Sequence, residues 1–251
     1  MVAEKLEGAL DELLAGDRPA ALFEAMRYAV MPGGKRIRPK ICFAAAVAVG
    51  GKMEDALYPA CAVELMHSYT LVHDDLPAMD GDTVRRGRPS VWAKFDEATA
   101  ILAGDSLQAL AFVAASRAPR NVGKVVATLG EAGLGVVRGQ QEELCSASGA
   151  DIDFIYRHKT GDLFVAAAVM GAYAAGGSDA DAGRLRGYAF NLGMAFQHRD
   201  DLLDGDSPCP VDDARRRVAE FTASAIASLN GLPGDASLLA ALAGHLAERG
   251  E

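Results

Sequence analysis

The chain has 251 residues, of which 50% are hydrophobic and 6% aromatic, and its 34 acidic and 25 basic residues give a formal net charge of −9. This acidic balance disfavours nucleic acid and an anionic membrane surface as partners. The length and apolar content allow one large core, and no charge-segregated tail or repeat divides the chain. Residues 1–251 are therefore expected to form a single domain.

The N-terminal stretch, MVAEKLEGALDELL, is amphipathic and acidic and lacks the apolar region of a secretory signal. The four cysteines are widely spaced without a CxxC pair, which is typical of a reduced compartment. The longest apolar run, Leu163–Ala175, is too short to span a bilayer. We therefore expect a cytoplasmic protein with no membrane span.

Long segments of the chain show helical periodicity. One example is the apolar set Ala62, Leu65, Met66, Tyr69 and Val72. There is no sustained alternation of period two and no Asn-Gly hairpin signal, so the fold class is expected to be all-α. Gly-Gly pairs that begin at positions 33, 50 and 176 are interpreted as connections between helices.

The first cluster of chemical interest is PGGKRIRP, residues 32–39, which places Lys35, Arg36 and Arg38 in a glycine-rich turn before the apolar run KICFAAAVAV. Glycine lets the backbone approach an anion, and cationic side chains can hold phosphate oxygens. The alternative is a basic loop with no ligand.

The segment HDDLPAMDGDTVRRG, residues 73–87, follows a helical apolar stretch and carries two arginines after four aspartates, Asp74, Asp75, Asp80 and Asp82. Aspartate at a helix C-terminus opposes the macrodipole, and crowded carboxylates repel each other unless a divalent cation lies between them. His67 lies two helical turns before Asp74 and would face the same side. The alternatives are a solvated helix end and a core histidine whose hydrogen bonds are satisfied.

A second cluster repeats this design in FNLGMAFQHRDDLLDGD, where an apolar helical run leads into Asp200, Asp201 and Asp204. Asp200 and Asp204 share one helix face, with Gln197 one turn earlier. Oxygen ligands without histidine or cysteine suit a hard ion, and Mg²⁺ prefers a few carboxylates together with substrate phosphates.

These segments, in order along most of the chain, resemble those of the trans-polyprenyl diphosphate synthases, and among them the bacterial farnesyl diphosphate synthases. The matching segments are GGKRIRP, ELMHSYTLVHDDLPAMDGDTVRRGRPS, ILAGDSLQALAF, GQQEEL, YRHKTGDLF and FNLGMAFQHRDDLLD. The resemblance implies a single polyprenyl synthase domain with an isoprenoid synthase-type helical bundle around a deep central cavity. It also implies a homodimer, and three Mg²⁺ ions when substrate is bound.

The implied activity is a Mg²⁺-dependent condensation of isopentenyl diphosphate with an allylic diphosphate, dimethylallyl or geranyl, to a short-chain product, with farnesyl diphosphate expected. The resemblance assigns catalytic roles to two sets of aspartates. The first set is Asp74, Asp75 and Asp80, and the second is Asp200, Asp201 and Asp204. The metal ligands among these would be Asp74, Asp75, Asp80, Asp200 and Asp204. Arg85 would bind the allylic diphosphate, and the isopentenyl diphosphate would contact Gly34, Lys35, Arg38, His67 and Arg86. Near the allylic group, or the cation formed from it, would lie three residues: Lys159, Thr160 and Gln197.

Product length is expected to depend on Tyr69, which lies more than one helical turn before Asp74 on the wall that the growing chain passes. Pro77 and Ala78, between the aspartates, resemble the inserted pair of the short-chain bacterial type. Together they indicate a fifteen-carbon product, while ordinary core packing is the alternative role for Tyr69.

One departure from the family pattern concerns the segment after the second aspartate motif. Family members usually carry a Gly-Lys pair and a Lys-Thr-Tyr segment there, whereas this chain has no lysine between Asp206 and Arg215. Either a loop is missing from this sequence, or the protein lacks a cation that closes over the allylic diphosphate. A catalytically silent partner subunit is therefore an alternative function. A terpene cyclase is a further one, but it would leave GGKRIRP and His67 unexplained.

Overall fold

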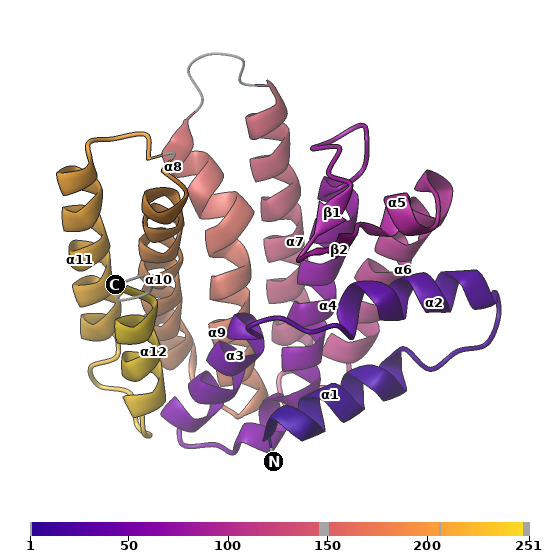
Figure 1. The fold of residues 1–251 in the computed structure, drawn as a ribbon. Coiled ribbons are helices and arrows are strands. Elements are labelled where there is room, and N and C mark those ends of the chain that lie inside the picture. The colour runs from indigo at the N-terminus through magenta and orange to yellow at the C-terminus, as the bar shows by residue number, and fades with distance from the viewer. Residues whose placement is uncertain (1, 146–150, 206, 248–251) are drawn as a thin grey trace.

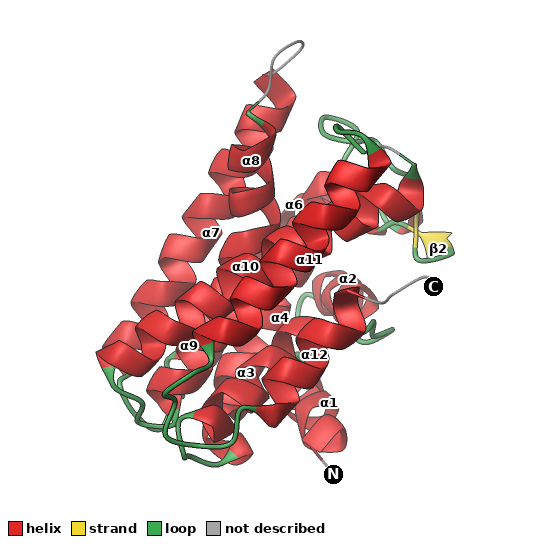
Figure 2. Cartoon of the chain, turned by 90° about the vertical axis from the view of Figure 1, so that its left-hand side faces the viewer, coloured by secondary structure: helices red, strands yellow, loops and turns green. Residues whose placement is uncertain are grey.

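The computed structural model describes residues 2–145, 151–205 and 207–247. It is an all-α bundle, and the expected fold class is confirmed (Figures 1 and 2). The first part of the chain forms α1 Val2–Leu13, α2 Ala20–Val30, α3 Ile37–Ala48, the 3₁₀ turn η1 Met53–Ala56, and α4 Leu57–Asp74. The next part forms α5 Val91–Lys94, α6 Glu97–Ala115, α7 Val122–Cys145 and α8 Ile152–Ile155. The last part forms the π-helix η2 Tyr156–Gly161, α9 Asp162–Ala174, α10 Asp179–Asp204, α11 Val211–Ser228 and α12 Ser237–Ala247.

The core is centred on α4 and α9. Helix α4 packs against α6 and α3, and α9 packs against α3, α7 and α10. Nearly every residue of α9 is buried, from Leu163 to Ala174, because neighbouring helices surround it. A helix that is apolar all round is typical of this position. These two helices fix where the functional segments at their ends lie.

Close approach of the helices depends on small residues. A Cβ at Gly171 of α9 would lie 2.2 Å from the carbonyl oxygen of Cys42 on α3. A Cβ at Gly193 of α10 would lie 3.0 Å from Cα of Gly161, the last residue of η2. The alanine- and glycine-rich composition therefore allows the backbones to pack closely.

The Gly-Gly pairs join helices as expected. The first glycine of each pair adopts a positive φ. Gly33 lies between α2 and α3, Gly50 follows α3, and Gly176 lies between α9 and α10. Such a conformation costs glycine little, which explains the residue at these turns.

One element was not predicted from the sequence. Two short strands, β1 Val84–Arg85 and β2 Arg88–Pro89, pair antiparallel, with Val84 opposite Pro89. The central residues of the turn between them, Arg86 and Gly87, both have positive φ, as a tight primed hairpin turn requires. A pair of two-residue strands is too short to show alternation in the sequence.

Helix α6 is long and apolar enough to cross a membrane by length and composition, and no other helix of the described residues meets both criteria. A core helix of a folded bundle meets the same criteria, and α6 packs against α4, α2 and α7. Its outer face exposes Ile101, Leu102 and Val113.

Candidate functional site

The first aspartate motif is shaped by the turn that follows α4. The Asp80 amide donates to the carbonyl oxygen of Asp74 at 2.9 Å, and the Gly81 amide donates to that of Leu76 at 3.0 Å. The chain thus folds back over Pro77 and Ala78, so that the backbone of Asp80 returns to that of Asp74. Sequence spacing alone does not show this return, because the helix has already ended.

Asp74 and Asp80 repel each other in this arrangement. Burial raises the pKa of Asp74 to about 6; Lys159 lowers it, and Asp80 raises it further. A carboxylate that is disfavoured in its charged form and faces a second carboxylate is a position where a cation is stabilised.

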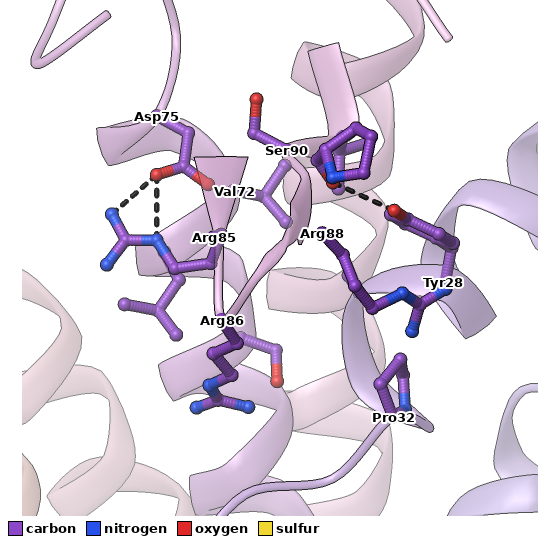
Figure 3. A pocket seen from close by; sticks show the side chains of 13 residues that line it. Tyr28, Pro32, Val72, Asp75, Arg85, Arg86, Arg88 and Ser90 are labelled. Atoms are coloured by element: carbon purple, nitrogen blue, oxygen red, sulfur yellow. Dashed lines mark hydrogen bonds and ion pairs between the residues drawn. The ribbon is translucent and has the colours of Figure 1, made fainter. Parts of the chain in front are cut away.

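Asp75 is held differently from its neighbour. Its side chain is 3% exposed, and Arg85 Nε donates to its Oδ1 at 2.9 Å. Burial raises the pKa of Asp75, while Arg85 opposes that shift. Figure 3 shows the two side chains directed at each other. The carboxylate of Asp75 therefore positions Arg85 in this structure. The role of Asp75 as a metal ligand stays a prediction.

The hairpin that carries Arg85 and Arg86 is anchored to α2. Tyr28 Oη donates to the carbonyl oxygen of Pro89 at 2.8 Å, and the Arg88 guanidinium lies 4.2 Å from the centre of the Tyr28 ring (Figure 3). A small cavity of about 60 Å³ lies between α2, α4 and the hairpin, and the buried Ser90 Oγ beside it has no hydrogen-bond partner among the described residues.

Arg86 joins the hairpin to the basic turn. Its Nη1 donates to the carbonyl oxygen of Gly33, and a Cβ at Gly34 would lie only 2.8 Å from that nitrogen. A side chain at position 34 would therefore displace the Arg86 guanidinium from this position. The structure thus brings together two segments that lie about fifty residues apart in the sequence.

The cations of the basic turn have different environments. Arg36 donates to Glu7 and Glu64 and is buried, so it stabilises the fold, whereas Lys35 is exposed. The Arg38 guanidinium lies 5.1 Å from the centre of the Phe164 ring, and its Nε has no partner among the described residues. Burial lowers the pKa of Arg38 to about 10. An unpartnered buried donor suits an anionic ligand.

His67 lies in the field of the same cations. Burial lowers the pKa of His67 well below its ordinary value, and Arg38, Arg86 and Arg85 lower it further. The imidazole is thus neutral near pH 7 and can donate one hydrogen bond without adding charge. Three different segments supply Arg38, His67 and Arg86. Because both arginines lower the pKa of His67, we infer that the three side chains lie close together.

The second aspartate motif lies on the last turns of α10, beside the π-helix η2. Gln197 Nε2 donates to Oδ1 of Asp201 at 2.9 Å, and Thr160 Oγ1 donates to Oε1 of Gln197 at 2.9 Å. Tyr156 Oη also donates to Asp201. The structure therefore brings the predicted residues Thr160, Gln197 and Asp201 into one hydrogen-bond network. Asp200 and Asp204 follow on the same helix, four residues apart.

Two residues of this region received no role from the sequence. Tyr156 binds Asp201, and Glu143 on α7 accepts a hydrogen bond from Lys159 Nζ. Both lie in segments that matched the family pattern, YRHKTGDLF and GQQEEL. That match was the only available signal, because a π-helix is not visible in hydrophobic periodicity.

The donor set fits Mg²⁺ that binds together with a phosphate ligand. The candidate ligands offer carboxylate oxygens only, and no group of three or more acidic, histidine or cysteine side chains among the described residues converges as a metal cluster. Mg²⁺ is commonly bound by one or two carboxylates while substrate phosphates and water complete its shell. The residues that would hold it are Asp74, Asp80, Asp200 and Asp204.

The segment after α10 contains no cation in its described part, Gly205 and 207–214. Gly205 ends α10 in the left-handed conformation, and Ser207 Oγ donates to the carbonyl oxygen of Cys209 at 2.9 Å. Asp206, one limit of the lysine-free stretch noted in the sequence, lies outside the described residues.

Comparison with known proteins gives consistent matches. The polyprenyl synthetase family model matches residues 19–208. The large subunit 1 of a heterodimeric geranylgeranyl pyrophosphate synthase from Arabidopsis thaliana is 42% identical over an alignment length of 221, and the match covers 80% of this chain and 59% of the relative. A dimethylallyltranstransferase from Fischerella ambigua is 42% identical over an alignment length of 213, and the match covers 80% of this chain and 62% of the relative. The chain thus spans about three fifths of the curated relatives it matches.

Solved structures match over nearly the whole chain. An FPP/GFPP synthase from Zymomonas mobilis has a TM-score of 0.91 and 34% identity, with 98% of this chain and 96% of that chain covered. A geranylgeranyl pyrophosphate synthetase from Pyrococcus horikoshii has a TM-score of 0.90 and 28% identity, with the same two coverages, 98% and 96%.

Proposed function

The chain belongs to the polyprenyl synthetase family, and we propose that it is a Mg²⁺-dependent prenyltransferase that joins isopentenyl diphosphate to dimethylallyl or geranyl diphosphate. The observation that carries the proposal is the presence of two kinds of site. Asp74 and Asp80 with the α10 aspartates form an acidic pair of motifs, while Arg38, His67 and Arg86 form a basic cluster drawn from other segments. Two substrates that each bear a diphosphate need both.

The allylic diphosphate would lie between the two aspartate motifs, with Arg85 as a further partner. When bound, Mg²⁺ would neutralise the charge that develops on the departing diphosphate. Breaking the allylic carbon–oxygen bond leaves a carbocation, and the dipoles of Thr160 and Gln197 would stabilise it without a full negative charge that could trap it.

Isopentenyl diphosphate would be held by Lys35, Arg38, His67 and Arg86. Its double bond attacks the allylic cation, which forms the new carbon–carbon bond, and loss of a proton to the released diphosphate completes the step. The partly buried Arg38, whose Nε has no hydrogen-bond partner among the described residues, supports this role, because an unpaired donor can bind a phosphate oxygen.

Farnesyl diphosphate is the proposed product. Tyr69 lies on α4 with 8% of its surface exposed, and its ring packs edge-on against His73 with centroids 5.0 Å apart. A Cβ at Gly104 of α6 would lie 2.1 Å from Nε2 of His73, so this aromatic pair fills the space between α4 and α6. Such a barrier favours a fifteen-carbon chain, whereas the similarity to geranylgeranyl synthases favours twenty carbons.

A homodimer is proposed as the working unit. The exposed apolar side chains of α6, Ile101, Leu102 and Val113, are matched on α7 by Leu134, which is 63% exposed, and Val137. A patch of exposed apolar residues on two long helices is typical of a protein interface. Sedimentation at several concentrations would show a concentration-independent monomer if this proposal were wrong. The cytoplasmic location stays a prediction.

The alternative, a catalytically silent partner subunit, is favoured by one observation: the described part of the segment after α10 carries no cation. The decisive experiment incubates the purified chain with Mg²⁺, dimethylallyl diphosphate and isopentenyl diphosphate, and identifies the prenyl alcohols after phosphatase treatment. We expect farnesol with Mg²⁺ and no product with EDTA. A folded protein that alone yields no alcohol longer than the five-carbon alcohols released from the substrates would support the silent subunit.

A further inference from the structure

The side chain of Tyr28 on α2 joins the β1–β2 hairpin to the bundle. Its Oη donates to the carbonyl oxygen of Pro89 in β2 at 2.8 Å, and the Arg88 guanidinium lies 4.2 Å from the ring centre (Figure 3). On α5, Lys94 Nζ lies 4.0 Å from the same centre, and the ring of Phe95, just after α5, packs edge-on with centroids 5.8 Å apart. One side chain of α2 thus contacts both the second strand of the hairpin and the helix that follows it.

The hairpin needs such a support because its turn is strained. Arg86 has a φ of 54° and Gly87 a φ of 73°. Glycine adopts this left-handed conformation at little cost, whereas a residue with a Cβ keeps it only where the surrounding structure holds it. The ladder itself consists of two residue pairs, and an isolated hairpin is at best marginally stable in water. The conformation of Arg86 therefore depends on contacts from outside the hairpin.

The two arginines of the hairpin differ in how their own side chains are held. Arg85 Nε donates to Oδ1 of Asp75 at 2.9 Å, so Arg85 keeps a tie to the end of α4 even if the hairpin shifts. Among the described residues, Arg86 donates only to the carbonyl oxygen of Gly33 and has no ion pair. Burial lowers the pKa of Arg38 to about 10 and Arg86 lowers it further, so these two cations repel each other. The position of Arg86 thus depends more on the support of the hairpin than that of Arg85 does.

We propose that Tyr28 is a positioning residue for isopentenyl diphosphate: it holds the hairpin so that Arg86 lies beside the basic turn before the substrate binds. The inference rests on the proposed function, which assigns Arg86 to this diphosphate. Without Tyr28, Arg86 would occupy the binding position for a smaller fraction of the time, and the apparent dissociation constant rises by the inverse of that fraction. The proposed catalytic carboxylates lie outside the hairpin, so kcat should change little.

Two variants of Tyr28 test this role by steady-state kinetics. Tyr28→Phe removes the hydroxyl and keeps the ring, and it should raise the KM for isopentenyl diphosphate about two- to tenfold, the range expected for one neutral hydrogen bond. The KM for the allylic substrate should rise less, because Arg85 keeps its bond to Asp75. Tyr28→Ala also removes the contacts of the ring with the two cations and should raise the KM for isopentenyl diphosphate further.

Tyr173→Phe is the matched control. Tyr173 Oη donates to Asp179 at 3.0 Å and Lys124 Nζ lies 4.9 Å from its ring centre, so the same kinds of contact occur at the end of α9 away from η2. This variant should leave both KM values unchanged.

A double-mutant cycle shows whether Tyr28 acts through Arg86. In an Arg86→Ala background, Tyr28→Phe should cause no further rise in the KM for isopentenyl diphosphate, because the side chain that it positions is gone. A general loss of stability would instead lower the melting temperature and the active fraction, and would act equally in both backgrounds. Equal rises in the two backgrounds, or an unchanged KM in Tyr28→Phe and in folded Tyr28→Ala, would overturn the proposal.

Binding without turnover distinguishes this proposal from the proposed function. Titration calorimetry with isopentenyl diphosphate alone, in EDTA, needs no reaction. A chain that forms no longer prenyl product but binds isopentenyl diphosphate more weakly in Tyr28→Phe would keep the positioning role and exclude the prenyltransferase. An active chain whose binding and KM are the same in both Tyr28 variants would do the reverse. An original chain that neither binds isopentenyl diphosphate nor turns it over would overturn both.

Discussion

The two aspartate motifs share a chemical pattern but differ in the partners that bind the second aspartate of each, Asp75 and Asp201. Near the first motif, Arg85 is bound to Asp75, and Lys159 lies close enough to lower the pKa of Asp74. The second motif ends an uninterrupted helix, where Gln197 and Tyr156, both neutral, bind Asp201. The described residues that follow it, up to Ala214, carry no cation.

This difference teaches that similar motifs can have unequal tasks. The carboxylates of the first motif are already divided, because Asp75 is committed to an arginine while Asp74 and Asp80 repel each other. In the second motif Asp201 accepts hydrogen bonds from two neutral side chains, and Asp200 and Asp204 lie on one helix face. If both motifs serve one diphosphate, we expect the second, whose Asp201 is bound to neutral groups and not to an arginine, to depend more strongly on Mg²⁺.

The largest expected effect comes from removing one carboxylate of either motif. Asp74→Ala and Asp200→Ala should each lower kcat by about 10²–10³, because loss of one preorganised stabilising group costs roughly 3–4 kcal/mol in the transition state. Steady-state kinetics at several Mg²⁺ concentrations measures this, and the Mg²⁺ requirement should rise more in Asp200→Ala.

The matched control for this pair is Asp212→Ala on α11, where the aspartate side chain is 97% exposed. This variant should keep nearly full turnover. Activity close to the original in Asp74→Ala or Asp200→Ala would remove that carboxylate from the mechanism.

A smaller effect is expected from the basic turn. Lys35→Ala and Arg38→Ala should raise the KM for isopentenyl diphosphate about ten- to a hundredfold, because a hydrogen bond to a charged group contributes roughly 1.5–3 kcal/mol. The KM for the allylic substrate should change little. An equal loss for both substrates would contradict the division into two diphosphate sites, and Lys52→Ala provides the control.

Tyr69→Ala tests whether the first motif's helix also sets product length. The variant should be about 3–5 kcal/mol less stable, because a buried aromatic side chain is lost, and it should release products of about twenty carbons or more. Chromatography of the dephosphorylated products and denaturant unfolding measure the two effects. Tyr69→Phe keeps the ring and should keep the product; an unchanged product from an active Tyr69→Ala would assign Tyr69 to core packing.

The smallest effect is expected from supplying a cation beside the second motif. Ser207→Lys should lower the KM for the allylic diphosphate by at most about fivefold, because an exposed ion pair contributes roughly 0–1 kcal/mol. Ser207→Gln is the uncharged control of similar length. Identical kinetics in both variants would show that the missing cation does not explain the difference between the motifs.

The sequence by itself determined the helical class and the positions of the clusters. Apolar spacing around Leu65 and Tyr69 predicted α4, and the Gly-Gly pairs predicted the connections, because these signals depend on local backbone geometry and on burial of one helix face. The two aspartate motifs and the basic turn were also visible, since each is continuous in the chain.

Only the tertiary structure decided which neighbouring side chain faces which partner. Asp74 and Asp75 are adjacent in sequence, yet one lies near Lys159 and the other binds Arg85. Arg36 and Arg38 are likewise two residues apart, and only Arg36 is neutralised by two glutamates. Consecutive residues at a helix end point in different directions, and their partners come from distant segments. Packing of the whole bundle therefore assigns the roles that a local pattern leaves open.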